Sequence, residues 1–250
     1  MNVEEVHLWR GSVEQQALRS QSVKTSQFAY FDKQLDRPDW AGKSVLDFGG
    51  NRGNILQDPS CRIDRSSYYC LDVIKEAIDE GRKTFPDAHW FHYNRYNCSF
   101  NPTGIANLAI PDFERKFDVI LAYSVFTHTT LEEMTELVSQ LEARLAPGGT
   151  FAFTFIDPHW NGNLKWRLQR VNGKADVEQS VGARWCALVN DELFIENNGR
   201  WVDETDSCLA NSCLTYHVFY TEEFLRELFP RAIVRPPVNG EMQHCCIIRK

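Results

Sequence analysis

A glycine-rich segment directly after a short apolar run contains the residues best suited to holding a ligand. The run Val45–Phe48 includes Asp47, and the glycine-rich segment spans residues 49–53. An apolar run that ends in such a turn is typical of a buried strand bending toward a helix, where open α/β sheets bind ligands. Asn is one of the few residues that tolerate a left-handed backbone, so Asn51 is compatible with the turn. We therefore expect a cofactor-binding loop made by Asp47, Gly49, Gly50, Asn51 and Gly53.

A second acidic residue at a strand end indicates a bound nucleoside. The apolar run Tyr68–Leu71 is followed by Asp72, 19 residues after Gly53, and then by a helical pattern over 74–81. A carboxylate at a strand end can accept hydrogen bonds from both hydroxyls of a ribose. Dinucleotide-binding enzymes place an acid at the same point, so Asp72 alone does not show whether the nucleoside belongs to a dinucleotide or to another cofactor.

The spacing of the glycines does separate dinucleotide binding from binding of another nucleoside cofactor. Dinucleotide folds use G-x-G-x-x-G and P-loops use G-x-x-x-x-G-K-[ST], whereas residues 47–53 follow D-x-G-x-N-x-G. This pattern resembles the first motif of class I S-adenosylmethionine (SAM) methyltransferases. In that family the loop lies under the methionine part of SAM, and an acid at the Asp47 position helps to hold its amino end.

The segment His89–Arg95 reads as a third strand that ends at Asn94. The family often has an Asp here that contacts the adenine amino group, and an Asn carbonyl could accept the same hydrogen bond. The other interpretation is that Asn94 only begins the loop that follows. The resemblance also implies cofactor contacts from Val73, Arg95 and Tyr123.

The next elements strengthen the resemblance. The continuous apolar stretch 116–126 is typical of a strand covered on both faces. Thr130 and Glu133 form a capping-box pattern ahead of apolar residues at helical spacing. Ala146–Gly149 should end that helix, and residues 150–156 alternate as a fifth strand. The run 117–155 thus resembles the family's fourth strand, helix, L-x-P-G-G turn and fifth strand.

The resemblance implies an α/β, Rossmann-like fold with a mostly parallel seven-stranded sheet and helices on both faces. We expect a single methyltransferase domain over 1–250, with an N-terminal helical cap (1–42), a SAM-binding core (43–156), a substrate-covering insertion (157–217) and a C-terminal helix and strands (218–250). Buried candidates in the cap are Leu18, Val23, Phe28 and Phe31. The insertion is rich in aromatic residues, and 187–195 has a hairpin pattern around Asn190-Asp191. A last helix is expected over 221–228, and strands over 232–235 and 243–248.

Several polar residues near the predicted strand ends could act as an acid or base. The candidates are Tyr123, His128, Asp157, His159 and His217. The family places the residues after the fourth strand near the transferred methyl group, which implies a role for His128; His217 lies between the insertion and the last helix. His128 and His217 are the catalytic candidates, either as a base or as groups that orient the acceptor. The sulfonium of SAM is already an activated leaving group, and methyl transfer often needs only alignment of the nucleophile.

Composition narrows the function classes. A net charge of −7 argues against extended contact with nucleic acid, and no apolar run approaches the ~18 residues of a membrane span. The eight cysteines form no C-x-x-C pair, so no metal site is expected, and the N-terminus lacks a secretory pattern, which favours a cytoplasmic protein. The predicted function is SAM-dependent O- or N-methylation of a small molecule, with S-adenosylhomocysteine (SAH) as product; one setting for it is secondary metabolism. The alternatives are a nicotinamide-dependent oxidoreductase and a non-catalytic SAM-binding protein, and the oligomeric state is open.

Overall fold

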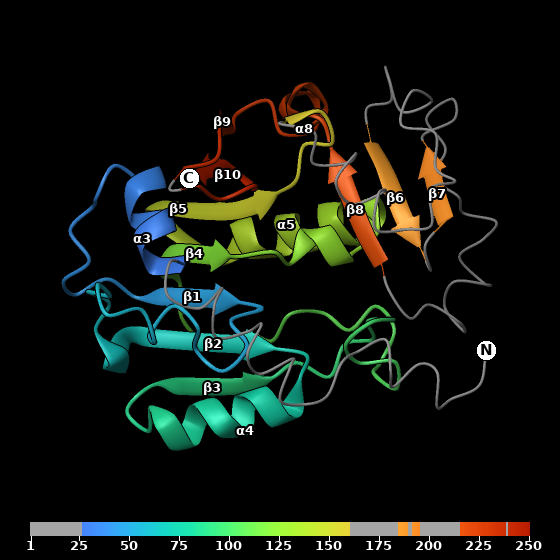
Figure 1. The fold of residues 1–250 in the computed structure, drawn as a ribbon. Helices are drawn as coiled ribbons and strands as arrows, with labels where there is room; N and C mark the ends of the chain where they lie inside the picture. The colour runs from blue at the N-terminus through green and yellow to red at the C-terminus, as the bar shows by residue number, and fades with distance from the viewer. Residues whose placement is uncertain (1–26, 161–184, 190–191, 196–215, 239) are drawn as a thin grey trace.

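The structure is a computed structural model that describes residues 27–160, 185–189, 192–195, 216–238 and 240–250. Its main feature is a seven-stranded sheet in the order β3-β2-β1-β4-β5-β10-β9 (Figure 1). All neighbouring pairs are parallel except those of β10, which runs antiparallel to both β5 and β9. The strands are β1 (Val45–Phe48), β2 (Tyr68–Asp72), β3 (His89–His92), β4 (Phe117–Ala122), β5 (Leu145–Phe155), β9 (Ile233–Arg235) and β10 (His244–Arg249). The predicted Rossmann-like sheet is confirmed.

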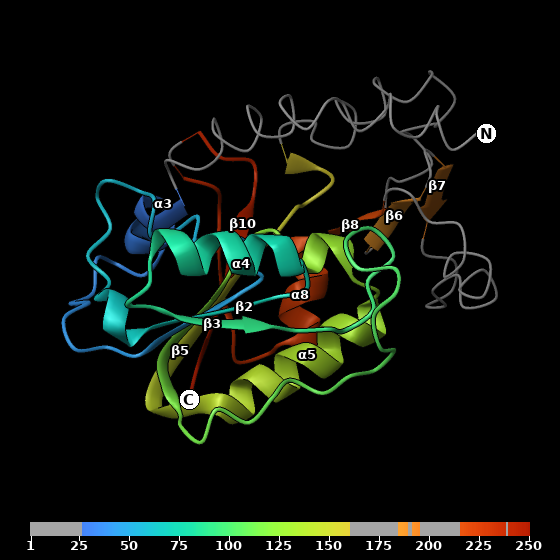
Figure 2. The same ribbon diagram turned by 90° about the horizontal axis from the view of Figure 1, so that it is seen from below.

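Helices cover both faces of this sheet (Figure 2). The described helices are α3 (Gln27–Gln34), α4 (Lys75–Thr84), α5 (Leu131–Arg144) and α8 (Glu222–Leu228), with 3-10 turns η1 (Arg65–Ser67) and η2 (Phe126–His128). Side chains from α3 and α4 pack in one apolar cluster, and those from α5 and α8 pack in the other. None of the helices that the structure describes is long and apolar enough to cross a membrane.

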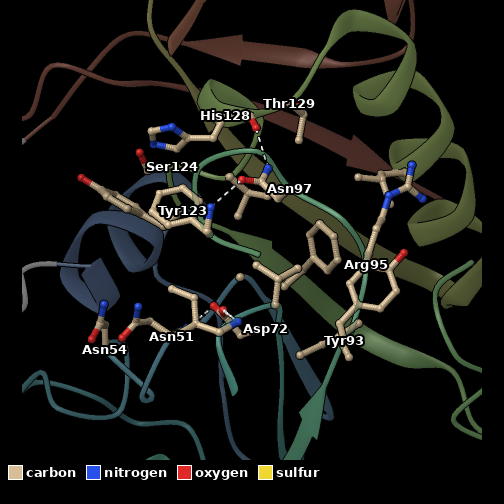
Figure 3. Close-up of a pocket in the computed structure, with 18 of the residues that line it drawn as sticks. Asn51, Asn54, Asp72, Tyr93, Arg95, Asn97, Tyr123, Ser124, His128 and Thr129 are labelled. Atoms are coloured by element: carbon tan, nitrogen blue, oxygen red, sulfur yellow. Dashed lines mark hydrogen bonds between the residues drawn. The ribbon is translucent and has the colours of Figure 1, made fainter. Parts of the chain in front are cut away.

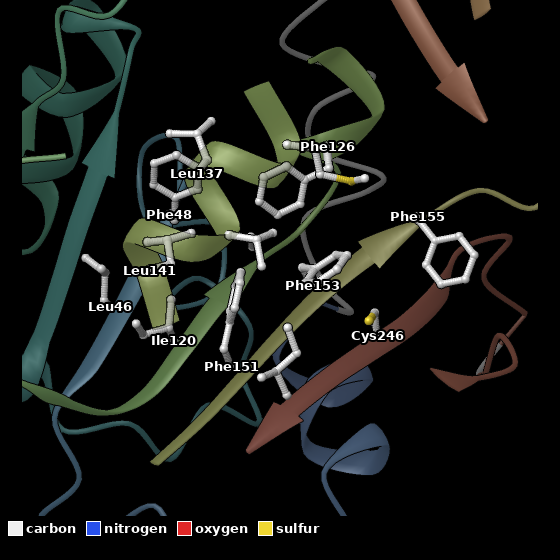
Figure 4. Packing of buried hydrophobic residues seen from close by; sticks show 14 of the residues in the cluster. Leu46, Phe48, Ile120, Phe126, Leu137, Leu141, Phe151, Phe153, Phe155 and Cys246 are labelled. Carbon is white, nitrogen blue, oxygen red and sulfur yellow. The ribbon is translucent and has the colours of Figure 1, made fainter. Parts of the chain in front are cut away.

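The strand sequences alternate between the two apolar clusters. Leu46 and Ile120 belong to the cluster under α5, whereas Val45, Val119 and Leu121 belong to the cluster under α3 and α4. This alternation follows from the pleat of a strand, which sends successive side chains to opposite faces. Figure 4 shows the aromatic part of the α5 cluster, built from Phe48, Phe126, Phe151, Phe153 and Phe155. The central strands read as continuous apolar runs because both faces are buried.

A second, three-stranded sheet has the order β7-β6-β8, from β6 (Trp185–Val189), β7 (Glu192–Ile195) and β8 (Tyr216–Tyr220). Val189 pairs with Glu192, so the predicted hairpin strands are confirmed; Asn190 and Asp191 themselves lie outside the described residues. Most of the insertion expected over 157–217 also lies outside the described residues, as do Leu18 and Val23 of the expected cap. Phe28 and Phe31 of α3 are buried as expected.

The helix signals predict their elements well. Thr130 accepts from the backbone N of Glu133, whose side chain accepts from the backbone N of Thr130, so the capping box is confirmed. Thr221 caps α8 in the predicted place. The largest differences are in three strand boundaries: β3 ends at His92 instead of Asn94, β4 ends at Ala122 instead of Phe126, and β5 begins at Leu145 instead of Thr150. β9 and β10 each begin one residue later than expected. Leu145 pairs with Phe117 before a register shift, so the predicted turn residues form an irregular first part of the strand.

Candidate functional site

A cavity of about 460 Å³ lies at the carboxyl ends of β1, β2 and β4. Its volume is within the ~300–1,000 Å³ typical of small-molecule sites. Its walls come from the loop after β1, the end of β2, the segment after β3, the residues from Tyr123 to Thr129, the start of α5 and residues 241–243. Figure 3 shows one end of the cavity with Asn51, Asn54 and Asp72, and the opposite end with Asn97, His128 and Thr129.

The glycine loop has the left-handed turns that its sequence requires. Gly49, Asn51 and Gly53 have φ values of 75°, 54° and 79°. A Cβ atom on Gly53 would lie 2.7 Å from the ring of Trp90, and one on Gly50 would lie 2.5 Å from Asp47 Oδ2. Gly50 and Gly53 therefore shape the loop from behind, while Gly49 and Asn51 line the cavity.

Asp72 ends β2 with its carboxylate at the cavity. Oδ2 accepts from the backbone N of Asn51 (2.7 Å), and Oδ1 accepts from the backbone N of Ile74 (2.8 Å). Burial raises the pKa of Asp72, and these two hydrogen bonds oppose the rise. Each oxygen keeps a second lone pair, so the carboxylate could also accept from two vicinal hydroxyls. Val73, which follows, lines the cavity as well.

Asp47 lies behind the loop and is not among the cavity-lining residues. It is 1% exposed, and the hydroxyl of Tyr68 donates to its Oδ2 (2.5 Å). Burial raises the pKa of Asp47 to about 7, the bond from Tyr68 opposes the rise, and the charge of Asp72 adds to it. The geometry thus gives Asp47 a supporting position beneath Gly50, and its contact with the amino end of a cofactor stays a prediction.

The segment after β3 folds differently from its sequence expectation. Asn94 is exposed, its Oδ1 accepts from Asn101, and it does not line the cavity, so the geometry gives its predicted adenine contact no support. Asn97 takes the place at the cavity wall, where Nδ2 donates to the backbone O of His128 (2.9 Å). The pairing of Arg95 with Ile105 in an isolated bridge folds this segment back on itself.

Arg95 lines the cavity but is held by other protein groups. Only 3% of its side chain is exposed, and its guanidinium donates to both carboxylate oxygens of Glu136 (3.2 and 2.8 Å) and to the backbone O of Leu108. Burial lowers the pKa of Arg95, but the bonds to Glu136 and Tyr93 outweigh it and keep the pKa above its ordinary value. Its predicted cofactor contact is therefore limited to the side-chain surface that faces the cavity.

Within the part of the chain that the structure describes, two polar atoms in the cavity wall have no hydrogen-bond partner. They are Oδ1 of Asn54 and Oγ1 of Thr129, both buried. A buried polar group without a partner costs about 1–3 kcal/mol, so such atoms at a cavity mark contacts that a ligand would complete. Sequence reasoning missed both residues, because no local sequence pattern indicates that a buried polar atom of Asn54 or Thr129 lacks a hydrogen-bond partner.

The predicted catalytic histidines lie together. His128 lines the cavity, whereas His217 on β8 is not among the lining residues. The ring centroid of His128 is 4.6 Å from that of His217 and 5.0 Å from that of Phe100. The other candidates lie elsewhere: His159 is exposed, and Asp157 accepts from the backbone N of His159 and of Glu222 without lining the cavity.

Tyr123 lines the cavity at the end of β4, as its predicted cofactor contact requires. Its hydroxyl donates to Oε2 of Glu241 (2.8 Å), and its ring meets those of Tyr30 and Phe31 edge-on. Burial raises the pKa of Tyr123. A neutral tyrosine whose proton is already donated to a carboxylate is suited to shaping the wall, not to acting as a base.

Comparisons with known proteins agree with this architecture. A family model described as a methyltransferase domain matches residues 46–151. No curated protein matches the chain by sequence. Similar solved structures include the SAM-bound amino pentose methyltransferase CalS10 of Micromonospora echinaspora (14% identity, 96% of this chain and 97% of that one, TM-score 0.55). Another is a SAM-dependent methyltransferase of Clostridium acetobutylicum (12% identity, 90% of each chain covered, TM-score 0.50). A third is the SAH-bound glycopeptide N-methyltransferase MtfA (10% identity, 90% of each chain covered, TM-score 0.51).

At such low identity the solved structures establish the fold, and the family model covers the segment from β1 into β5 that carries the glycine loop and Asp72. The residues present fit SAM, because the cavity joins a strand-end carboxylate that can accept further hydrogen bonds to a loop of close backbone turns, and two buried polar atoms of its described wall have no partner. Residues 46–151 therefore match a methyltransferase domain, and the chain as a whole has the fold of the solved SAM-dependent methyltransferases.

Proposed function

We propose that this enzyme methylates an oxygen or nitrogen atom of a small-molecule acceptor and releases SAH. The observation that carries the proposal is that one cavity is lined both by Asp72 with its glycine loop and by His128. A cofactor held by Asp72 and an acceptor beside His128 would therefore share one cavity. Bound SAM supplies an activated methyl group to this volume.

The solved structures favour a small acceptor. Two structures that share the fold are an amino pentose methyltransferase and a glycopeptide N-methyltransferase. The segment 157–217 is proposed to cover the acceptor. This is supported at its end, where His217 of β8 contacts His128 of η2.

The chain's own residues orient the acceptor. Asn97 fixes the backbone at His128, and the rings of Phe100 and His217 contact the His128 ring. Alignment of a nucleophile with the transferred group can contribute about 7–11 kcal/mol. When the nucleophile is a hydroxyl or a protonated amine, a neutral His128 or His217 ring nitrogen could take the proton as the new bond forms.

The test begins with a thermal-shift screen of candidate acceptors in the presence of SAH, followed by methyl-transfer assays on the hits. If a histidine acts as base, His128→Ala or His217→Ala should lower kcat by about 100- to 10,000-fold and leave SAH affinity unchanged. His159→Ala is the matched control, because this exposed histidine does not line the cavity and takes no part in the ring contact between His128 and His217. Unchanged kcat in both His128 and His217 variants would refute a catalytic role for the pair.

A further inference from the structure

The cavity wall around His128 contains an exposed apolar ring. Phe100 lines the cavity, is 46% exposed, and makes an edge-on contact with His128 at a centroid distance of 5.0 Å. A large apolar side chain that stays exposed in a concave site is typical of a surface that a ligand covers. An aromatic ring in this position can pack against the ring of a ligand. Phe100 therefore gives this end of the cavity an apolar wall suited to a cyclic molecule.

Asn97 holds Phe100 and His128 in fixed relative positions. Its Oδ1 accepts from the backbone N of Ser99 and of Phe100 (3.1 Å each), and its Nδ2 donates to the backbone O of His128 (2.9 Å). Its main chain exchanges two further hydrogen bonds with Asn101 (2.9 and 3.1 Å). One amide side chain thus joins the loop after β3 to the segment after β4. A wall held in this way loses little entropy when a ligand binds to it.

The hydroxyl of Thr129 differs from those of the threonines on either side of it. The hydroxyl of Thr127 donates to the backbone O of Ser124 (3.0 Å), and that of Thr130 accepts from the backbone N of Glu133 (3.1 Å). Oγ1 of Thr129 is buried and has no partner among the described residues. Of these three threonines, only Thr129 lines the cavity. A buried hydroxyl without a partner is unfavourable unless a ligand supplies its hydrogen bond.

Thr129 lies at the end of the cavity that is proposed for the acceptor. Figure 3 shows Asp72 at one end of the cavity and both His128 and Thr129 at the opposite end. The carboxylate of Asp72 is suited to ribose hydroxyls, so its end belongs to the cofactor. His217, the last residue of the segment proposed to cover the acceptor, contacts His128. The hydroxyl of Thr129 is therefore placed for a hydrogen bond with the acceptor.

We propose that Phe100 and Thr129 form a subsite for the methyl acceptor, and that the acceptor is a ring with a second polar substituent beside the atom that is methylated. This inference rests on the proposed function and deepens it. His128 is the group proposed to serve the methylated atom, which leaves Thr129 for the second polar group. Asn97 is the positioning residue of this subsite. Phenolic rings and amino-sugar rings both have the required chemistry.

Replacement of Thr129 by valine separates a hydroxyl that binds a ligand from one that stabilises the fold. Valine has nearly the same shape, and the extended backbone of Thr129 (φ −126°, ψ 157°) accepts it without strain. The melting temperature should stay unchanged or rise, whereas Thr127→Val should lower it by removing a buried hydroxyl that has a partner. Calorimetry should show that Thr129→Val binds SAH with wild-type affinity.

Methyl transfer from labelled SAM to matched pairs of rings tests the second polar group. One arm uses catechol and phenol, and the other uses amino pyranosides with and without a hydroxyl beside the amine. In the arm that contains the correct ring, the wild-type kcat/KM should be about 5- to 150-fold higher for the member with the extra substituent. Thr129→Val should bring this ratio to about one. Thr135→Val should keep it, because the hydroxyl of Thr135 bonds to the backbone O of Leu131 outside the cavity lining.

The positioning role of Asn97 has its own control. Asn97→Asp keeps an acceptor for the backbone N of Phe100 but loses the donor to the backbone O of His128. It should lower kcat/KM about 10-fold and reduce the preference within a pair, with SAH affinity unchanged. Phe100→Ala should raise KM for both members of a pair and keep their ratio. Asn94→Asp makes the same change at an exposed residue outside the lining and should behave as the wild type. Equal losses in the two aspartate variants would refute the role of Asn97.

Four results would overturn the subsite. They are a wild-type preference that survives in Thr129→Val, a loss of SAH affinity of about 5-fold or more in that variant, a melting temperature lowered as far as in Thr127→Val, and a wild-type protein that binds SAH but methylates no member of either arm. The second result would assign the Thr129 hydroxyl to the cofactor, and the third would assign it to the fold. A wild-type protein that does not bind SAH would instead refute the proposed function itself.

Discussion

Replacement of Asp72 by alanine should affect affinity and stability together, and the structure separates the two effects. The carboxylate accepts two backbone N–H groups, from Asn51 (2.7 Å) and Ile74 (2.8 Å), and has lone pairs left for ribose hydroxyls. Loss of charge-assisted bonds to the ribose, worth about 1.5–3 kcal/mol, should weaken SAH about 10- to 100-fold. Loss of the acceptors for two backbone donors should lower the free energy of unfolding by about 2–4 kcal/mol.

Asp118→Ala is the matched control for this experiment. Asp118 accepts from the backbone N and the hydroxyl of Ser44 (2.8 Å each) near the start of β4, away from the cavity. This variant should also lose stability, measured by urea unfolding, yet bind SAH in calorimetry as the wild type does. If a folded Asp72→Ala protein binds SAH with wild-type affinity, or if Asp118→Ala weakens SAH equally, Asp72 does not hold the ribose.

Three further outcomes follow from buried contacts. Because the pKa of Asp47 is raised to about 7 in the folded protein, its carboxyl keeps a proton between about pH 4 and 7 that the unfolded chain loses, and stability falls as pH rises through this window. In Asp47→Asn, urea unfolding at several pH values should show that the free energy of unfolding falls by ~4 kcal/mol less across this window. An unchanged slope of the unfolding free energy against pH would contradict the raised pKa of Asp47. Gly81→Ala should lower the melting temperature although alanine favours helices, because its Cβ would lie 2.2 Å from the Trp90 ring; an increase would mean that Trp90 moves aside. Glu136→Ala should cost about 3 kcal/mol in urea unfolding, more than Arg95→Met, because it removes both close hydrogen bonds to a carboxylate from a cation with 3% exposure and leaves it the longer 3.9 Å contact with Glu133; the reverse order would contradict this.

The elements of the fold could be predicted because their signals are local. The capping box at Thr130 and the apolar run that ends at Asp72 each depend on a few consecutive residues, and both lie where their sequences indicate. The wall of the cavity could not be predicted in the same way. Asn97 replaces Asn94 there because the chain folds back through the bridge between Arg95 and Ile105.

Ser124, which lines the cavity with a left-handed backbone (φ 58°), shows the same limit more clearly. Its conformation depends on Thr154, 30 residues away, and on Gln243, a further 89 residues along the chain. No spacing rule connects residues on three different elements of a sheet. Asp47 was placed correctly at the end of β1, yet its side chain turns to Tyr68 on the neighbouring strand, a pairing that only the register of β1 against β2 determines.

The position of β10 in the sheet has a consequence for synthesis of the protein. β10 is the last of the sheet strands in the chain but lies between β5 and β9, and residues 241–243 directly before it complete the cavity wall and the contacts of Gln243 with Thr154 and Tyr30. A chain growing on the ribosome could pair β1 to β5 early, but β5 would present an open edge until β10 emerges. The nascent polypeptide therefore cannot complete the cavity wall before residues 241–243 and β10 are translated, and chains that stop short of β10 would lack part of the site and be prone to edge-to-edge association.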